Sequence, residues 1–269
     1  MKARLIAGLM AVFFSAATMQ WTWQEPCVNE PYAYAWQDEN RAIAITTMAV
    51  DKSVVYVADV QLRSAEGFHT ARPEHGTGRL SDMVKDTDAV LAVNADNYRS
   101  HGYGVIIRDG ECIRRSKSTR HLLAVHRDGS LEAVTDRRTV RAAELAQRLT
   151  AQGTLQTFEF GPMLVAQGEP VAFPKTFRLI STSPYRREPR TAIGMIAPLH
   201  YVIVVVDGRR PGYSEGVSLQ TLQQIFVALG VQTAFNLDGG GSTELWFQGE
   251  IINRPSGGGE RSMSDCIWF

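Results

Sequence analysis

The sequence lacks the features that mark several large classes of protein. Its 28 lysines and arginines balance 28 aspartates and glutamates and are scattered along the chain, so no cationic surface for nucleic acid is expected. The 3 cysteines have no CxxC spacing and the 6 histidines no HExxH spacing, so nothing indicates a structural zinc site. No repeat and no low-complexity linker interrupts the chain. These absences favour a globular domain without a nucleic-acid partner.

Long hydrophobic runs are also scarce, and only the N-terminal one has a targeting pattern. Lys2 and Arg4 precede an apolar run over residues 5–17, which ends in small residues, as in a secretory signal. This run is shorter than the roughly 20 apolar residues of a membrane span. We therefore expect residues 1–19 to be a signal peptide or an N-terminal anchor, with the mature protein beginning near Thr18. The remainder is expected to be exported, touching a membrane only through that segment.

The cysteine count limits the disulfides that an exported protein of this sequence can form. An exported protein can form disulfides, but three cysteines cannot all pair within one molecule. We expect Cys112 to pair with Cys266, although the sequence alone leaves the pairing with Cys27 open.

Most of the chain has the pattern of short β-strands. Apolar and β-branched runs recur between turn residues, and Asp109-Gly110 and Asp128-Gly129 each separate two such runs, as in β-hairpins. We therefore predict an α+β fold, in which a large mixed, mostly antiparallel sheet carries a few packed helices in a single domain. The predicted strands are residues 43–48, 53–60, 89–94, 105–107, 111–114, 122–126, 131–134, 163–166, 192–196, 201–206, 233–236, 245–247 and 263–268.

Two segments have helical periodicity instead. Residues 219–229 place their apolar side chains on one face, with Ser218 as N-cap and Gly230 as the residue that ends the helix. A second helix is predicted over residues 140–149. Both are expected to pack on the sheet as support.

Polar residues suited to catalysis or ligand binding concentrate in the last third of the chain. Asp207 and Asp238 each end an apolar strand and are followed by glycine, which favours a position facing a cleft. Glycine leaves backbone N–H groups open to an anion, hydroxyls add donors, and arginine binds phosphate in a bidentate fork. The residues predicted to hold an anionic ligand are Arg190, Arg209, Gly239, Gly240, Gly241, Ser242 and Thr243.

Each of these residues also has a simpler interpretation, because turns use Asp-Gly pairs and glycine runs as well. The loop is not a P-loop, since no Gly-Lys-Ser/Thr follows, and Gly241-Ser242-Thr243 does not match a nucleophile elbow. Kinase, nucleotide-hydrolase and serine-hydrolase functions are therefore disfavoured.

The order of several segments resembles the phosphodiester glycosidase family. The resemblance begins near Asp82, and we assign residues 38–269 to this domain. Its motifs are residues 94–98 (NADNY), 104–110 (GVIIRDG), 161–164 (GPML), 190–194 (RTAIG), 207–209 (DGR), 236–243 (NLDGGGST), 253–256 (NRPS) and 260–261 (ER).

The resemblance implies a hydrolase that cleaves between a sugar's anomeric carbon and a phosphodiester. Such hydrolysis needs a carboxylate that activates water or attacks the sugar, and donors for the phosphate. Asp207 and Asp238 are the leading pair, with Glu215 and Asp96 in reserve. Asn94, Asp96 and Asn236 join the predicted substrate-binding residues. In residues 94–98, Asn-Ala-Asp-Asn-Tyr replaces the common Asn-Gly-Gly-Phe-Phe, which adds the acid Asp96 to a substrate loop.

The resemblance leaves substrate and chemistry partly open. An exopolysaccharide, an envelope glycan or a glycolipid carrying a sugar such as N-acetylglucosamine would suit the site, and the oligomeric state is undetermined. One alternative is a non-catalytic binder of phosphate-containing glycans. Another is a phosphodiesterase that breaks a P–O bond, which normally needs a metal cluster. We expect no cofactor, except that a single divalent cation at Asp96, Asp207 or Asp238 is conceivable.

Overall fold

The computed structural model describes residues 32–135, 139–173 and 184–269. The predicted signal or anchor segment and Cys27 lie outside the described residues. Within the described part of the chain, no helix is long and apolar enough to cross a membrane.

The largest element is an eight-stranded sheet in which every neighbouring pair of strands is antiparallel. The long hairpin predicted near the N-terminus is present, and its turn residues Asp51 and Lys52 adopt the positive φ of a tight hairpin turn. In spatial order the strands are β1 (Tyr34–Gln37), β2 (Arg41–Val50), β3 (Ser53–Leu62), β14 (His200–Val206), β13 (Arg190–Ala197), β15 (Thr233–Asn236), β11 (Met163–Ala166) and β12 (Glu169–Pro170).

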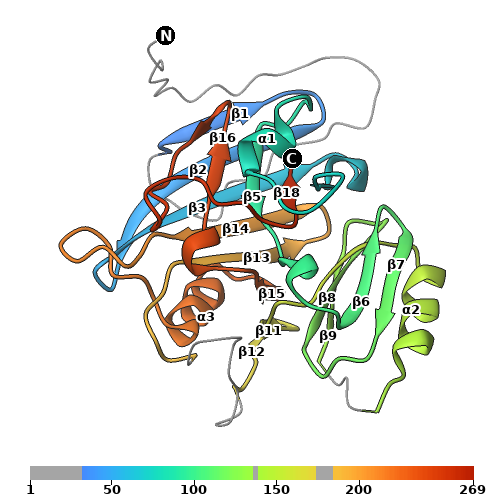
Figure 1. Cartoon of the computed structure of the whole chain (residues 1–269). Helices are drawn as coiled ribbons and strands as arrows, with labels where there is room; N and C mark the ends of the chain where they lie inside the picture. Colours follow the sequence, from blue (N-terminus) through green and yellow to red (C-terminus); the bar gives the residue numbers. More distant parts are fainter. Residues whose placement is uncertain (1–31, 136–138, 174–183) are drawn as a thin grey trace.

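A second, five-stranded antiparallel sheet packs against the first (Figure 1). Side chains of both sheets, such as Ile203 from the first and Val93 from the second, share one buried apolar cluster, so the two sheets form a sandwich. The order of the second sheet is β17 (Glu250–Ile251), β16 (Leu245–Phe247), β5 (Leu91–Asn94), β18 (Cys266–Trp268) and β4 (His69–Ala71).

The continuous apolar run of β14 arises because both of its faces are buried. Tyr201, Ile203 and Val205 point into the sandwich, while the alternate residues face helix α3 (Leu219–Ala228) on the outer side of the first sheet. The side chain of Ser218 accepts a hydrogen bond from the backbone N of Thr221, which confirms the predicted N-cap. Helix α1 (Leu80–Val84) packs on the outer face of the second sheet.

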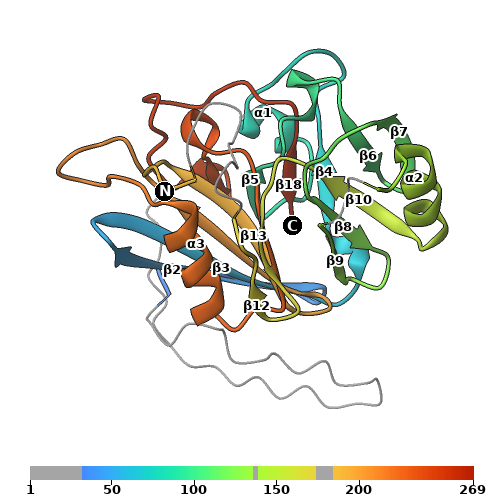
Figure 2. The same ribbon diagram turned by 90° about the horizontal axis from the view of Figure 1, so that it is seen from below.

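A smaller lobe stands beside the sandwich, as Figures 1 and 2 show. The lobe has an apolar cluster of its own, which lies between its strands and helix α2 (Ala142–Ala151). Both predicted Asp-Gly hairpins occur here. The lobe contains a two-stranded sheet of β6 (Gly104–Arg108) and β7 (Glu111–Ser116), and a three-stranded sheet ordered β10 (Thr154–Phe158), β8 (Leu122–His126) and β9 (Leu131–Val134). Short 3₁₀ turns occur at η1 (Ala65–Gly67), η2 (Tyr98–Ser100) and η3 (Gly240–Ser242).

Two expectations need correction. The predicted mostly antiparallel strands with a few packed helices are confirmed, but the strands form two packed sheets and two small ones instead of one large sheet. The described part of the chain is also richer in β-structure than the predicted class implies. Cys112 and Cys266 are both free thiols and belong to different apolar clusters, so the predicted disulfide between them is wrong.

The contact between α3 and the first sheet generates a stability prediction. A Cβ added at Gly194 would lie 2.8 Å from Phe226 Cε1 and 3.1 Å from Val231 Cγ1. Gly194→Ala should therefore lower the free energy of unfolding by about 1–3 kcal/mol, through overpacking. Urea denaturation measures this, with Gly257→Ala as control, because nothing lies within 4 Å of that added Cβ. Equal losses in the two variants would contradict the packing argument.

Candidate functional site

The ends of three strands meet at one edge of the sandwich. Strand β13 runs antiparallel between β14 and β15, with Arg190 opposite Val206 and Ala192 opposite Asn236. The first residue of β13 therefore lies beside the last residues of its neighbours. This places Arg190 near Asp207 and Asp238, two of the residues identified from the sequence.

The side chain of Asn94 fixes the second sheet to this edge. Its Oδ1 accepts hydrogen bonds from Thr191 Oγ1 at 2.7 Å and from the backbone N of Glu244 at 3.2 Å, and its Nδ2 donates to the backbone O of Asp238 at 2.6 Å. Asn94 is 1% exposed. Asn94 is therefore placed to hold the surrounding backbone in position. A direct contact of Asn94 with substrate stays a prediction.

Asp238 is partly exposed and begins the glycine-rich loop. Its Oδ1 accepts a hydrogen bond from the backbone N of Gly239 at 2.9 Å, and Ser242 also donates to the carboxylate. Burial raises the pKa of Asp238, while Ser242, Gly239 and the charge of Arg261 oppose the rise. Among the predicted acids, Asp238 thus combines partial access with a raised pKa, as a general base requires.

Two arginines flank the loop that Asp238 begins. Gly240 has a φ of +62°, and a Cβ there would lie 2.9 Å from Arg209 Nη2, so the guanidinium packs directly on the loop. A Cβ on Gly241 would lie 3.3 Å from Arg261 Nη1, so a second guanidinium also lies against the loop. Arg261 belongs to the motif at residues 260–261, and its position against the loop adds it to the residues expected from the sequence.

The three glycines also serve close packing. A Cβ on Gly239 would lie 2.7 Å from the backbone O of Pro189, and the N–H of Gly240 donates to the same oxygen at 2.9 Å. The N–H of Gly239 is engaged by Asp238, and the N–H groups of Ser242 and Thr243 donate to carbonyls within the loop. The N–H groups of Gly239 and Gly240, two of the three backbone donors expected for an anion, thus bond inside the protein. This shifts the expected anion contacts toward the arginines.

The buried carboxylate of Glu188 forms ion pairs with two arginines, Arg209 and Arg186. Arg209 Nε lies 2.6 Å from Glu188 Oε2 and Arg186 Nε lies 3.2 Å from Glu188 Oε1, while the carboxylate is nearly inaccessible. Arg190 is 3% exposed and donates to the backbone O of Val217 and of Arg186. Burial and the nearby charge of Arg209 lower the pKa of Arg190 to about 10, although Glu188 opposes this. Three guanidinium groups around one carboxylate leave an excess of positive charge beside the loop.

Asp207 is held by a different set of groups. Its carboxylate accepts hydrogen bonds from Tyr213 Oη at 2.8 Å, from Asn253 Nδ2 at 2.9 Å and from the backbone N of Arg254 at 3.1 Å. Burial raises the pKa of Asp207, and these donors oppose the rise. Asn253 also donates to the backbone O of Thr243, so Asp207 anchors the far end of the glycine-rich loop. Its catalytic role stays a prediction, with an anchoring role now visible.

Two other predicted residues lie outside the Asp238 contacts. Glu215 Oε2 is 3.5 Å from Arg187 Nη1, and its backbone N donates to the backbone O of Lys52 in the turn between β2 and β3. Asn236 is buried, and its Nδ2 donates to the backbone O of Gly161 and of Leu237. Asn236 therefore supports the strand end behind Asp238.

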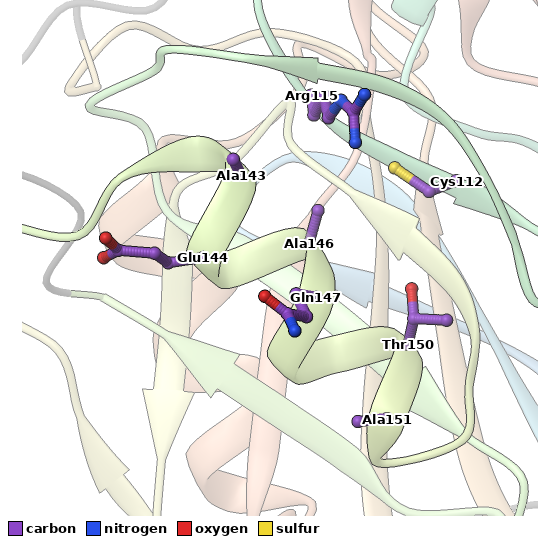
Figure 3. Close-up of a pocket in the computed structure, with 8 residues that line it drawn as sticks. All are labelled: Cys112, Arg115, Ala143, Glu144, Ala146, Gln147, Thr150 and Ala151. Carbon is purple, nitrogen blue, oxygen red and sulfur yellow. The ribbon is translucent and has the colours of Figure 1, made fainter.

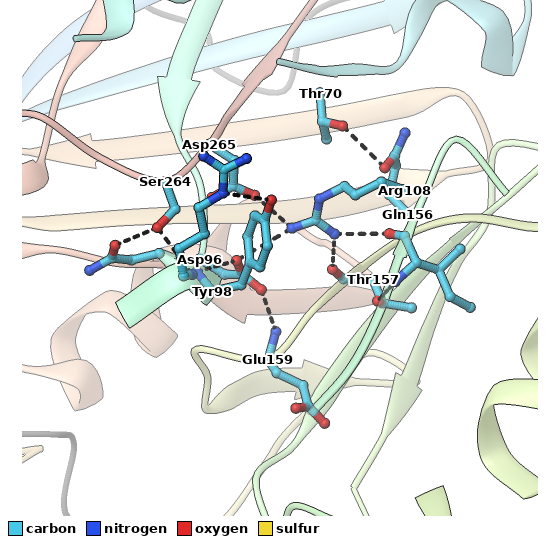
Figure 4. A network of polar contacts seen from close by, with 12 residues as sticks. Thr70, Asp96, Tyr98, Arg108, Gln156, Thr157, Glu159, Ser264 and Asp265 are labelled. Carbon is cyan, nitrogen blue, oxygen red and sulfur yellow. Dashed lines mark hydrogen bonds and ion pairs between the residues drawn. The ribbon is translucent and has the colours of Figure 1, made fainter. Parts of the chain in front are cut away.

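Asp96 lies in a buried ion cluster next to this site (Figure 4). It is 0% exposed and faces Arg108 and Asp265, two residues that the sequence did not suggest. The extra acid of the loop is thus turned into the protein. No pattern in the sequence indicates this, because Asp265 lies far from Asp96 along the chain and the direction of the Arg108 side chain on β6 is set by the folded structure.

Glu244, directly after the glycine-rich loop, is a further acid that the sequence patterns do not single out. It is 0% exposed, and its Oε1 accepts a hydrogen bond from the backbone N of Arg261 at 2.6 Å. No hydrogen-bond partner for Oε2 occurs among the described residues. Burial, reinforced by the charge of Glu260, raises the pKa of Glu244 to about 7.

A concave surface in the smaller lobe is separate from these groups (Figure 3). It has a volume of about 550 Å³ and is lined by α2 and β7, including Cys112 and Arg115. Its remaining lining residues come from the helix and include several alanines, so it lacks a convergent set of catalytic groups. No group of three or more metal-ligating side chains occurs in residues 32–135, 139–173 and 184–269.

Comparisons with known proteins agree with this architecture. The family model for phosphodiester glycosidase matches residues 87–269. The chain is 30% identical over 192 residues to the SPβ prophage-derived uncharacterized protein YomE of Bacillus subtilis, covering 69% of this chain and 28% of that protein. The chain thus spans less than a third of the length of this curated relative.

Solved structures with the same fold are more distant in sequence. The catalytic domain of zebrafish N-acetylglucosamine-1-phosphodiester alpha-N-acetylglucosaminidase, auto-inhibited by its pro-peptide, has a TM-score of 0.65 at 18% identity, over 90% of this chain and 84% of that one. A Burkholderia pseudomallei protein named as a candidate exported protein has a TM-score of 0.56 at 17% identity, over 80% and 73% of the two chains.

The buried carboxyl of Glu244 leads to a prediction about stability and pH. Its pKa is higher in the folded than in the unfolded chain, so its contribution to stability is lost as pH rises from about 4.5 to about 7. Glu244→Gln should therefore match the wild type in unfolding free energy near pH 4 and exceed it at pH 8. Denaturant unfolding across this range measures the difference, and a variant less stable than wild type at pH 8 would refute the assignment.

Proposed function

Because the chain belongs to the phosphodiester glycosidase family, we propose that it hydrolyses the bond between a sugar's anomeric carbon and a phosphodiester. The substrate class that we propose is an exopolysaccharide, envelope glycan or glycolipid with a sugar-1-phosphodiester, N-acetylglucosamine being one candidate sugar. The zebrafish enzyme that shares the fold is named for this kind of bond.

The observation that carries the proposal is the arrangement around Asp238. A partly exposed carboxylate with a raised pKa begins a loop against which the guanidinium groups of Arg209 and Arg261 both pack. A glycosyl phosphodiester needs both kinds of group, a carboxylate for the anomeric carbon and cations for the phosphate. The surplus of arginines around Glu188 supplies the positive charge that an anionic substrate requires.

In the proposed reaction, Asp238 acts on the anomeric carbon, either by taking a proton from water or by direct attack. The bond between the anomeric carbon and the phosphate oxygen breaks, the bonding electron pair leaves with the phosphate monoester, and water supplies the new C–O bond. Arg209, with Arg190 behind it, stabilises the charge on the leaving phosphate. A phosphate monoester leaves readily, so protonation of the leaving group matters less than for an ordinary glycoside.

The other predicted acids have supporting roles in this proposal. Asp207 fixes the end of the glycine-rich loop through Asn253 and remains the second candidate catalytic acid. Glu215, at the turn between β2 and β3, is the reserve. Ser242 orients the carboxylate of Asp238, and Thr243, Asn94 and Asn236 hold the surrounding backbone.

We also propose that the protein acts outside the cytoplasm. Support comes from the N-terminal pattern over residues 1–19, and from the Burkholderia structure of the same fold, which is named as a candidate exported protein. An anchor in place of a cleaved signal would tether the domain to the membrane.

Hydrolysis in ¹⁸O-labelled water should place the label on the sugar, because water attacks the anomeric carbon. Mass spectrometry of the products of a panel of sugar-1-phosphodiesters makes the measurement. Label in the phosphate would support the phosphodiesterase alternative, and binding of the substrates without any product would support the non-catalytic alternative.

Asp238→Asn should lower turnover by on the order of a hundredfold or more without loss of the fold, because it removes the charge and keeps the shape. The measurement is kcat on a sugar-1-phosphodiester, with thermal unfolding beside it. Asp128→Asn is a matched control, since Asp128 also precedes a glycine at a turn but lies exposed in the smaller lobe. Near-normal turnover in well-folded Asp238→Asn would remove Asp238 from the mechanism.

A further inference from the structure

The guanidinium group of Arg261 packs directly on the glycine-rich loop. A Cβ added at Gly241 would lie 3.3 Å from Arg261 Nη1 and 3.7 Å from Arg261 Cδ. The same group is near enough to Asp238 for its charge to lower the pKa of that carboxylate. The position of this cation relative to the loop therefore depends on how the backbone of residue 261 is held.

The chain that leads to Arg261 does not hold it by packing. Gly257, Gly258 and Gly259 are exposed, and no atom would lie within 4 Å of a Cβ added at any of them. Gly258 also has a φ of +88°, which favours glycine. Three successive glycines leave many backbone conformations open unless the residues after them are fixed by other contacts.

Two carboxyl groups provide these contacts. The Oε1 of Glu244 accepts a hydrogen bond from the backbone N of Arg261 at 2.6 Å. Glu260 accepts hydrogen bonds from the backbone N of Ser81 at 2.8 Å and from Ser81 Oγ at 2.7 Å, in the first turn of α1. Residues 260 and 261 are thus bonded through side chains to two separate parts of the second sheet and its covering helix.

Glu244 is itself held by the junction that fixes Asp238. Its carboxyl group is buried, and its backbone N donates to Asn94 Oδ1 at 3.2 Å. The Nδ2 of Asn94 donates to the backbone O of Asp238 at 2.6 Å. One amide group therefore fixes both the start of the glycine-rich loop and the residue that holds Arg261, so the guanidinium and the candidate base keep a defined relation.

We propose that Glu244 and Glu260 are positioning residues for Arg261: they hold its backbone so that the guanidinium group stays against the glycine-rich loop and binds the phosphate of the substrate. This role rests on the proposed function, in which cations beside the loop bind a phosphodiester. It assigns a purpose to Glu244, a buried acid that the proposed reaction does not use.

The test is the steady-state kinetics of Glu244→Leu on a sugar-1-phosphodiester, since leucine removes the acceptor for the Arg261 N–H. We expect kcat/KM to fall about tenfold, mainly through a higher KM, because a cation that binds the phosphate has lost its fixed position. Glu244→Gln keeps an oxygen acceptor on a side chain of the same length, so its KM should stay close to that of the wild type.

A double-mutant cycle separates positioning from a general loss of packing. In the Arg261→Gln background, Glu244→Leu should have no further effect on kcat/KM, because the guanidinium through which it acts is already absent. Gly194→Ala is the stability control, since its overpacking lies at the contact with α3 and should leave kcat/KM unchanged. An undiminished effect of Glu244→Leu in the Arg261→Gln background, or normal kcat/KM in folded Glu244→Leu, would overturn the proposal.

Glu260→Ala covers a loss of folding by Glu244→Leu, because it removes the bonds of the same segment to Ser81. It should raise KM in the wild-type background and not in Arg261→Gln. Unchanged kinetics of Glu260→Ala in that case, or a failure of both variants to fold, would assign the two carboxyl groups to folding alone and overturn the proposal.

A binding measurement distinguishes this proposal from the proposed reaction. If the wild type shows no turnover, the reaction fails, and calorimetric titration with inorganic phosphate takes the place of kinetics. The Kd should then rise about tenfold in Glu244→Leu and not rise further when this substitution is added to Arg261→Gln. A Kd that is the same in the wild type and in folded Glu244→Leu, or no binding of phosphate by the wild type, would overturn the positioning role.

Discussion

The amide of Asn94 is the contact on which the geometry of the site depends. The two sheets of the sandwich end at the same edge, and Asn94 joins them there through Thr191 of the first sheet and the backbone of Glu244 in the second. Its remaining bond, to the backbone O of Asp238, fixes the start of the glycine-rich loop to this junction. A residue with both a donor and an acceptor on one planar group is needed, which a carboxylate or an apolar side chain of similar size does not provide.

Charge is distributed unevenly on the two sides of this junction. On the side of β13, Arg186 and Arg209 form ion pairs with the carboxylate of Glu188, and the charge of Arg190 lies nearby. On the side of the smaller lobe, two carboxylates share the guanidinium of Arg108. The loop that begins with Asp238 lies between these clusters. An excess of cations attracts an anionic group, while an excess of buried acids raises the pKa of a neighbouring carboxylate. Their combination suits a site that binds a phosphodiester and holds a proton-accepting acid beside it.

The sequence predicted local structure well because local patterns determine it. The hairpin of β2 and β3, the two Asp-Gly hairpins and the capped helix α3 all follow from periodicity and turn residues within a few positions. The family resemblance was also confirmed, by a match over residues 87–269. Partners distant in the chain were not predictable. Nothing near Asp96 in the sequence indicates that its carboxylate lies close to Asp265, with Arg108 between them. The spacing of Cys112 and Cys266 likewise does not show that they pack in different apolar clusters.

The glycine-rich loop shows why residue type alone does not assign a role. Glycine permits an anion to approach backbone N–H groups, but it equally permits the protein's own groups to approach. Here the carbonyl of Pro189 and the guanidinium of Arg209 occupy the space that side chains on Gly239 and Gly240 would fill. The loop consequently brings a cation against its own backbone, next to Asp238. In the proposed function, recognition of a phosphate would therefore depend on the direction of the guanidinium groups, and ion pairs with Glu188 hold those of Arg209 and Arg186.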